Sequence, residues 1–202
     1  AWTIVPRHVL GGAGRVPPSE KLNIAGIGVG GQGAGDIQNV SSENIVALCD
    51  VDRAHAAQTF KRHPNARAYS DFRVMLEKED KNIDAVVVAT PDHTHAVAAM
   101  MAIKMDKHVF CEKPLTHSMY EAREIAKAAR EAGVATQMGN QGHAGEGIRL
   151  ICEWIWDGAI GPVREVHAWT THAVWPQGLQ RPRETPPVPE TLDWDLWLGP
   201  AP

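Results

Sequence analysis

The sequence predicts an α/β fold, a Rossmann-type doubly wound parallel sheet followed by an incomplete α+β domain. Three observations predict it. Between residues 21 and 140, short apolar runs alternate with helical patterns, which is typical of parallel strands joined by right-handed crossovers. Residues 85–89 are continuously apolar, as in a strand that is covered on both faces. Beyond residue 140 the composition changes, because six of the seven tryptophans lie after residue 150.

Each predicted element follows from its local pattern. Apolar runs predict strands at 22–27, 45–49, 85–89, 107–111 and 134–138, and the helical segments between them lie at about 33–40, 53–62, 71–79, 94–105 and 118–132. The last of these helices ends at Gly133, since glycine favours the left-handed conformation at a helix end. Further along, the pattern predicts a helix at 145–157, a strand at 163–171 and an extended proline-rich segment at 176–189.

Composition and charge exclude several classes of partner. The 202 residues include 20 basic and 24 acidic side chains, for a net charge of -4, so we expect no nucleic-acid partner. The longest apolar run, 96–103, is far shorter than the roughly 20 residues of a membrane-spanning helix. The three cysteines are too scattered for a disulfide framework or a zinc site. Cys49 and Cys111 lie in apolar runs, where buried and reduced thiols are expected.

A glycine-rich segment, GIGVGGQG, follows the first predicted strand. It contains the pattern G-x-G-x-x-G in two frames, one beginning at Gly26 and one at Gly28. The second frame is preferred, because the first would end the strand before Ile27. A flexible loop is the alternative interpretation, but a strand before the motif and a helix after it favour dinucleotide binding.

In the preferred frame each glycine has a physical role. Gly28 makes the tight turn, Gly30 lets the backbone approach a pyrophosphate, and Gly33 lets the new helix pack against the strand. Gly31 and Gln32 lie at the start of that helix, whose free N–H groups favour a bound anion.

Asp50 ends the second predicted strand, 22 residues after Gly28. A carboxylate there accepts hydrogen bonds from the adenosine ribose hydroxyls and repels a 2′-phosphate, so we expect NAD as the cofactor rather than NADP. The alternative is that Asp50 or Asp52 only caps the helix that begins near Arg53. Both interpretations hold together if Asp50 binds ribose and Asp52 caps. Arg53 weakens the choice between the two cofactors, since a guanidinium can bind a phosphate.

The third predicted strand ends in ATPDHTH. Ligands of doubly wound sheets gather at the carboxyl ends of the strands, which places Thr90 and Pro91 at the cofactor edge. His93 and His95 are two residues apart, but a lone H-x-H pair is poor evidence for a metal, and we expect no metal site. His93 is interpreted as part of a helix start and His95 as a neighbour of the cofactor.

The fourth predicted strand ends in FCEKP, and here the chain resembles the Gfo/Idh/MocA oxidoreductases, the relatives of glucose–fructose oxidoreductase and inositol 2-dehydrogenase. The resemblance runs from about residue 22 to the end of the chain and includes GIGVGGQG, Asp50, TPDHTH, EKP, VREVHAWT and WPQG. It implies that Lys113 contacts the nicotinamide end of the cofactor and the reacting hydroxyl group. It also implies that the Lys113–Pro114 peptide is often cis. Glu112 is expected to orient Lys113 or to hold a ribose.

The chemistry of hydride transfer agrees with a catalytic role for Lys113. A hydride leaves a C–H carbon only if the proton of the attached O–H group is taken up. A lysine amine can accept it when the amine is desolvated beside a positive charge. On spacing alone, a surface Glu–Lys pair before a turn is the better interpretation of EKP, and the glycine motif reverses that preference.

The resemblance also implies how the chain is divided. Residues 1–20 are an extended N-terminal segment, 21–140 the NAD-binding Rossmann domain, and 141–202 the start of a truncated C-terminal substrate and dimerisation domain. Members of the family place a second catalytic pair, an Asp and a His, beyond the point where this sequence stops. His143, His167 and His172 do not follow the spacing of that pair.

Three residues after the last predicted strand are candidates for the nicotinamide pocket. Asn140 and Gln141 follow the strand directly, and Trp175 lies in AVWPQG. Packing in a core or an interface explains Trp175 equally well.

Together these features predict an NAD-dependent oxidoreductase that acts on the CH–OH group of a small sugar or polyol. The alternatives are an NAD-dependent glycosidase that oxidises its sugar transiently, and a non-catalytic NAD-binding module. We expect a homo-oligomer, because several tryptophans of the last 60 residues would leave an apolar surface exposed. The first 20 residues resemble the segment after a twin-arginine export signal, which implies a periplasmic protein; otherwise the cytoplasm is expected.

Overall fold

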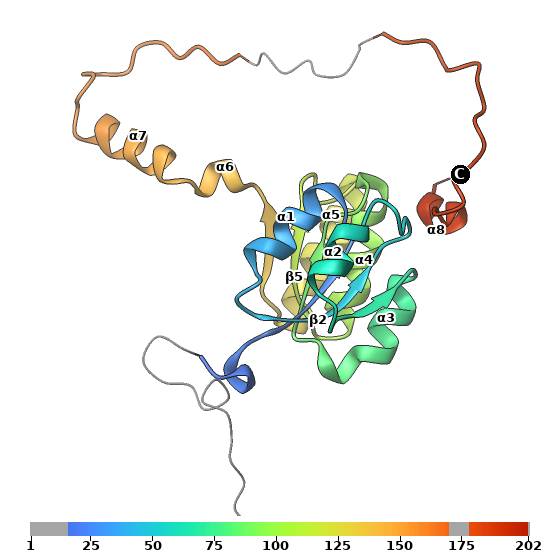
Figure 1. Ribbon diagram of the computed structural model, residues 1–202. Coiled ribbons are helices and arrows are strands. Elements are labelled where there is room, and N and C mark those ends of the chain that lie inside the picture. The colour runs from blue at the N-terminus through green and yellow to red at the C-terminus, as the bar shows by residue number, and fades with distance from the viewer. Residues whose placement is uncertain (1–15, 170–177, 202) are drawn as a thin grey trace, which may run out of the picture. The chain divides into compact units, whose positions relative to one another are not determined.

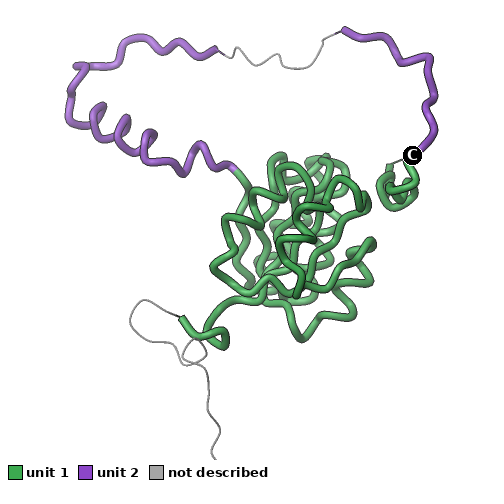
Figure 2. The backbone as a smooth tube through the Cα atoms, viewed as in Figure 1, with its two compact units in different colours: residues 1–139, 189–202 green, residues 140–188 purple. Residues whose placement is uncertain are grey.

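The computed structural model describes residues 16–169 and 178–201, which fall into two compact units. The first unit contains residues up to Gly139 together with the segment from Pro189 onward, and the second contains residues from Asn140 to Val188 (Figure 2). The chain therefore leaves the first unit after its last strand and returns to it at its C-terminal end. Residues before and after the second unit thus contribute to the same compact body.

The first unit is built on a parallel six-stranded sheet with strand order β3-β2-β1-β4-β5-β6 (Figure 1). The strands are β1 (Asn23–Ile27), β2 (Asn44–Cys49), β3 (Arg67–Tyr69), β4 (Ala85–Val88), β5 (His108–Glu112) and β6 (Thr136–Gly139). The order runs outward in both directions from β1 and β4, so the point where the winding reverses lies between these two strands. A doubly wound sheet binds its ligands beside that point, and the predicted fold class is confirmed.

Helices cover both faces of this sheet. They are α1 (Gly31–Asn39), α2 (Ala57–Arg62), α3 (Phe72–Glu79), α4 (His95–Lys104) and α5 (Met119–Ala132), with short 3₁₀ helices at Pro18–Glu20, Asp80–Asn82 and Asp92–Thr94. One apolar core forms where α3, α4 and α5 pack on the sheet, and a second forms under α1 and α2. The five predicted helices and five predicted strands are confirmed with shifts at their ends.

Strand β4 shows why the sheet needs two cores. Val86 and Val88 lie in the core under α3, α4 and α5, whereas Val87 between them lies in the core under α1 and α2. Successive side chains of a strand point to opposite faces, so a strand covered on both sides must be apolar at every position. Burying each valine stabilises the fold by about 1.5–3 kcal/mol.

Helix α5 has well-defined ends. At its start the Ser118 side chain accepts a hydrogen bond from the Glu121 backbone N–H, and the Glu121 carboxylate accepts one from the Ser118 N–H at 2.9 Å. At its end Gly133 has φ +69°, the left-handed conformation that the sequence predicted there. These contacts satisfy backbone groups that the helix ends would otherwise leave unpaired.

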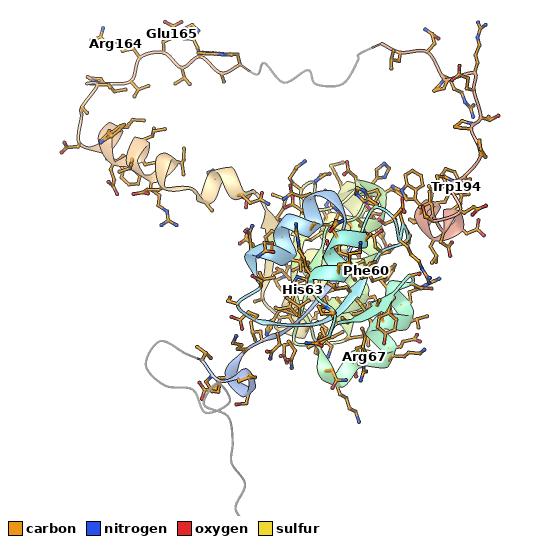
Figure 3. The ribbon with its side chains drawn as sticks, viewed as in Figure 1. Phe60, His63, Arg67, Arg164, Glu165 and Trp194 are labelled. Atoms are coloured by element: carbon orange, nitrogen blue, oxygen red, sulfur yellow. The ribbon has the colours of Figure 1, made fainter. Side chains whose placement is uncertain are left out.

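Strand β3 was missed by the sequence patterns, because Arg67–Tyr69 has only three residues and no apolar run. A polar cluster ties it to α3 instead. The Glu79 carboxylate, buried at the end of α3, accepts two hydrogen bonds from Arg67 (2.6 and 2.7 Å), one from Tyr69 Oη (2.5 Å) and one from Asn82 (3.1 Å). The Arg67 hydrogen bonds, aided by those from Tyr69 and Asn82, outweigh the effect of burial and lower the pKa of Glu79 to about 2. Arg67 itself lies at the sheet edge (Figure 3).

The second unit contains α6 (Gln141–Ala144) and α7 (Glu146–Trp156). The predicted helix at 145–157 is confirmed, but the predicted strand at 163–171 is wrong over its described part, because residues 163–169 form no strand. Alternating side chains alone do not make a strand, since its backbone groups need a paired neighbour, and the described part of this unit contains none. The apolar face of α7 is exposed at Ile151, Trp154 and Ile155. Homo-oligomerisation stays a prediction.

The C-terminal segment forms a short helix, α8 (Trp194–Leu198), that the sequence patterns also missed. It belongs to the first unit, and Asp193 caps it by accepting a hydrogen bond from the Leu196 N–H at 3.1 Å. Within residues 16–169 and 178–201, no helix has both the length and the apolar composition to cross a bilayer.

The Glu79 cluster gives a stability prediction with a defined pH dependence. Glu79→Gln replaces a charged hydrogen-bond acceptor by a neutral amide. The free energy of unfolding at pH 7 should therefore be lower in the variant by about 1.5–3 kcal/mol. The folded-state pKa is lowered from 4.5 to about 2, so the carboxylate's contribution is present above pH 4.5 and is lost as the pH falls toward 2. Urea unfolding at a series of pH values measures this difference. Glu77→Gln, an exposed change on the same helix, is the control, and a Glu79 effect independent of pH contradicts the assignment.

Candidate functional site

A cavity of about 360 Å³ lies within the first unit, beside the carboxyl ends of β1, β2 and β4. Its size falls within the range of small-molecule sites, about 300–1,000 Å³. The cavity brings together seven of the predicted cofactor residues: Gly28, Gly30, Gly31, Gln32, Asp50, Thr90 and Pro91. They come from three separate stretches of the sequence, which the sheet places side by side at the winding reversal.

The glycine turn between β1 and α1 has no room for side chains. Gly28 has φ +75°, and a Cβ atom there would lie 2.7 Å from the Ala89 carbonyl oxygen. A Cβ at Gly33 would overlap the Gly28 carbonyl oxygen, so helix α1 can approach the turn only with glycine at this position. Above Gly30 lies the imidazole of His55, where a Cβ would collide with the ring. Glycine is therefore sterically required at positions 28 and 33, where a Cβ would meet backbone atoms, whereas at position 30 the nearest obstacle is the exposed His55 side chain.

Asp50 holds this turn in place. Its Oδ2 accepts hydrogen bonds from the backbone N–H groups of Val29 (2.8 Å) and Gly30 (3.0 Å), and its Oδ1 accepts one from the Asp52 N–H (2.9 Å). Bonds to an ionised carboxylate are roughly twice as strong as neutral ones. The side chain is buried, and its hydrogen bonds add to those from the Gly28 N–H to the Cys49 carbonyl oxygen (2.9 Å) and from Thr59 Oγ1 to the Val29 carbonyl oxygen (2.7 Å), which also hold the turn.

Asp52 holds the turn that leads into α2. Its Oδ1 accepts hydrogen bonds from the N–H groups of Ala54 (2.9 Å) and His55 (3.2 Å). Burial raises the pKa of Asp52, but the hydrogen bonds from His55, Thr191 and Ala54 outweigh burial and lower it overall. Helix α2 itself begins at Ala57, and its N-cap residue Ala56 provides no side-chain cap. The expectation that Asp52 caps this helix is therefore wrong, because the helix begins four residues after Arg53.

His95 connects two loops at the edge of the sheet rather than lining the cavity. The side chain is buried, with Nδ1 2.7 Å from the Pro114 carbonyl oxygen and Nε2 2.7 Å from the Thr90 carbonyl oxygen. A neutral imidazole has one N–H and can donate to one of the two oxygens, whereas an imidazolium donates to both. Either form joins the end of β4 to the peptide that follows Lys113.

The Lys113–Pro114 peptide is cis, as the resemblance implied. Lys113 is exposed beyond the end of β5, and its backbone N–H donates to Glu112 Oε2 at 3.2 Å. Glu112 is buried against Gly139, where a Cβ would lie 2.6 Å from Glu112 Oε1. Glycine at the end of β6 thus leaves space for the carboxylate that precedes Lys113.

Another buried carboxylate, that of Asp36, lies on α1. Asp36 Oδ1 accepts a hydrogen bond from the Gln32 amide at 2.9 Å, which fixes a side chain that lines the cavity. Burial raises the pKa of Asp36, the Gln32 hydrogen bond opposes this, and the charge of Glu112 raises it further. Asp36 therefore orients Gln32 from beneath the glycine turn.

The two cysteines of the first unit are free and buried, as expected. Burial, together with the negative charge of Glu112, raises the pKa of Cys111 to about 12. Burial and the charge of Asp50 also raise the pKa of Cys49. Neither thiol is a nucleophile at neutral pH, because the thiolate is the reactive form.

Three predicted site residues lie outside the described part of the first unit. Asn140 and Gln141 begin the second compact unit, and Trp175 lies outside the residues that the structure describes. In the described parts of the chain, no group of three or more His, Cys, Asp or Glu side chains is arranged so that it could hold a metal ion.

The sequence analysis did not assign several residues of the cavity wall to the site, among them His55, Ser70, Phe72, Leu192, Leu196 and Trp197. Ser70 and Phe72 follow β3, and recognising this short strand would have placed them at the ligand edge. The three C-terminal residues carried no local signal that they return to the first unit.

The comparison with known proteins agrees with this geometry. Residues 21–140 match the model of the GFO_IDH_MocA family, described as an oxidoreductase family with an NAD-binding Rossmann fold. The inositol 2-dehydrogenase of Rubrobacter xylanophilus is 29% identical over 160 residues, which are 77% of this chain and 45% of the relative. The 1,5-anhydro-D-fructose reductase of Ensifer adhaerens is 39% identical over 102 residues, 50% of this chain and 30% of the relative.

Among solved structures, the myo-inositol 2-dehydrogenase of Lactobacillus plantarum superposes with a TM-score of 0.65 at 25% identity, covering 70% of this chain and 43% of that protein. The matched region thus spans less than half of each of these three relatives.

The Asp50 contacts predict a local effect on the glycine turn. Asp50→Asn removes the negative charge and replaces one acceptor oxygen by an amide N–H₂ group. That group then faces at least one of the three backbone N–H donors, which loses its hydrogen bond. We expect a loss of about 1–3 kcal/mol in unfolding free energy, with faster amide hydrogen exchange at Val29 and Gly30. Denaturant unfolding and exchange measured by NMR test this. Asp92→Asn, an exposed change after β4, is the control, and unchanged exchange at both amides would show that Asp50 does not hold the turn.

Proposed function

The chain belongs to the Gfo/Idh/MocA family of oxidoreductases with an NAD-binding Rossmann fold, and we propose that it binds NAD for the oxidation of a CH–OH group in a sugar or polyol. The observation that carries the proposal is the glycine turn locked to Asp50 at the wall of a cavity. The names of the relatives support the substrate class, because one acts on inositol and another on an anhydro sugar.

The residues present fit a dinucleotide. Gly28 and Gly33 sit where any side chain would collide with backbone, so the turn is as tight as a pyrophosphate site requires. Gly30, Gly31 and Gln32 open helix α1 at the cavity wall, where N–H groups and the helix dipole favour the phosphates. Thr90 and Pro91 form the opposite wall after β4.

Asp50 supports NAD over NADP. An ionised carboxylate has about four acceptor sites, and three backbone N–H groups use three of them. The remaining site is free to accept a ribose hydroxyl, whereas a 2′-phosphate would meet a buried negative charge. Arg53 opposes the preference for NAD, because its guanidinium could bind a 2′-phosphate. It is exposed and follows Asp52, which lines the cavity.

Bound NAD supplies the hydride acceptor. In our proposal Lys113 Nζ accepts the proton of the substrate hydroxyl group. Without such an acceptor the proton would remain on the oxygen that becomes a carbonyl oxygen. Glu112 and His95 position Lys113: Glu112 contacts its backbone N–H, and His95 contacts the next residue's carbonyl oxygen. Asn140 and Trp175 remain proposed linings of the nicotinamide pocket.

Replacement of Lys113 tests the proposed chemistry. Lys113→Ala, in the protein at its natural length, should lower turnover of inositol by roughly 10²–10⁴-fold, while the dissociation constant for NAD changes little because Asp50 and the glycine turn hold the adenosine half. NADH absorbance measures turnover and calorimetry measures binding. Lys127→Ala on α5, also an exposed lysine, is the control.

The same assay separates the competing functions. Release of nitrophenol from nitrophenyl glycosides without net NADH would indicate a glycosidase, and binding without either product would indicate a non-catalytic module. If the Lys113→Ala variant keeps the turnover of the unaltered protein, Lys113 is not catalytic and EKP is only a charged turn at the end of a strand.

A further inference from the structure

The C-terminal segment 189–199 is attached to the first unit by backbone contacts. The Arg53 N–H donates to the Thr191 carbonyl oxygen (3.1 Å) and the Asp193 N–H donates to the Val51 carbonyl oxygen (2.9 Å), so residues 191–193 pair antiparallel with the chain that follows β2. The Asp52 carboxylate also accepts a hydrogen bond from the Thr191 side chain. The segment is therefore fixed beside Asp50.

Helix α8 makes a second attachment on the far side of the cavity mouth. The Trp197 carbonyl oxygen lies 3.0 Å from His93 Nε2, and the two rings meet edge to face at 5.5 Å. Trp194, at the start of α8 (Figure 3), stacks on another ring of the same helix. That ring belongs to Trp197, with a centroid distance of 5.1 Å and an interplanar angle of 10°. One end of the segment thus contacts the loop after β2 and the other contacts the loop after β4.

Between these attachments the segment presents apolar side chains to the cavity. Leu192, Leu196 and Trp197 line the same space as Asp50 and the glycine turn. Phe72 after β3 and Pro91 after β4 line it as well. A space lined by these apolar side chains, next to the carboxylate proposed to bind ribose, has the character of a site for a purine base, whose faces are apolar.

We propose that residues 189–199 form a wall of the adenine subsite and hold the adenosine half of the cofactor, with Leu196 and Trp197 as the main contacts. The inference rests on the proposed binding of NAD and names residues for it that lie outside the segment matched by the family model, 21–140. Because the segment contacts the loops on both sides of the subsite, loss of its apolar side chains should weaken binding of adenosine itself.

The test is calorimetric titration of this chain with AMP, ADP-ribose and NAD. Trp197→Ala and Leu196→Ala should each raise all three dissociation constants by a similar factor of about 10, which corresponds to about 1.4 kcal/mol and is the size expected for a lost base contact. Trp197→Phe should retain most of the affinity. Trp156→Ala on α7, an exposed tryptophan of the second unit, is the matched control. Thermal unfolding verifies that each variant is folded.

A second measurement uses the unaltered chain, so that the proposal can be tested even if a variant fails to fold. AMP should slow amide hydrogen exchange in residues 191–198. Unchanged or tighter AMP binding in folded Trp197→Ala, or no protection of 191–198 by AMP, would overturn the adenine wall while leaving NAD binding intact. A chain that binds neither AMP nor NAD would overturn both this inference and the proposed function.

Discussion

The Asp50 carboxylate, with its hydrogen bonds from the N–H groups of Val29, Gly30 and Asp52, is the interaction on which the rest of the site depends. It fixes the end of β2 to the glycine turn after β1. The position of this glycine turn then determines where helix α1 begins. Glycine at 28 and 33 removes the side chains that would keep these pieces apart. A buried carboxylate needs such donors to offset its desolvation, so the charge and the turn stabilise each other.

The sequence predicted most of the first unit because its signals are local. Continuous apolar runs predicted β1, β2 and β4, and Gly133 predicted the end of α5. The glycine motif and Asp50 predicted residues that line one cavity. Strand β3 was missed because it is held by the Glu79 cluster rather than by an apolar run, and the predicted strand at 163–171 does not form in its described part.

The role of the C-terminal segment could not be predicted from local pattern. The segment had no visible partner in the sequence, since the residues that hold it, His93 against Trp197 and Val51 against Asp193, lie about 100 residues or more away in the chain. Similarly, the alternation of polar and apolar residues did not reveal that both ring nitrogens of His95 contact backbone carbonyl oxygens. Contacts of this kind depend on how the loops at the sheet edge are folded together.

In our proposal Asp50 and the glycine turn build a site for NAD. Parallel titrations of the chain with NADH and NADPH, followed by nicotinamide fluorescence, are the decisive measurement. We predict that NADH binds more tightly and that Asp50→Ala narrows the difference between the two, because a 2′-phosphate then no longer meets the carboxylate. Equal affinity of the unaltered chain for both cofactors, or no binding of either, would contradict the account.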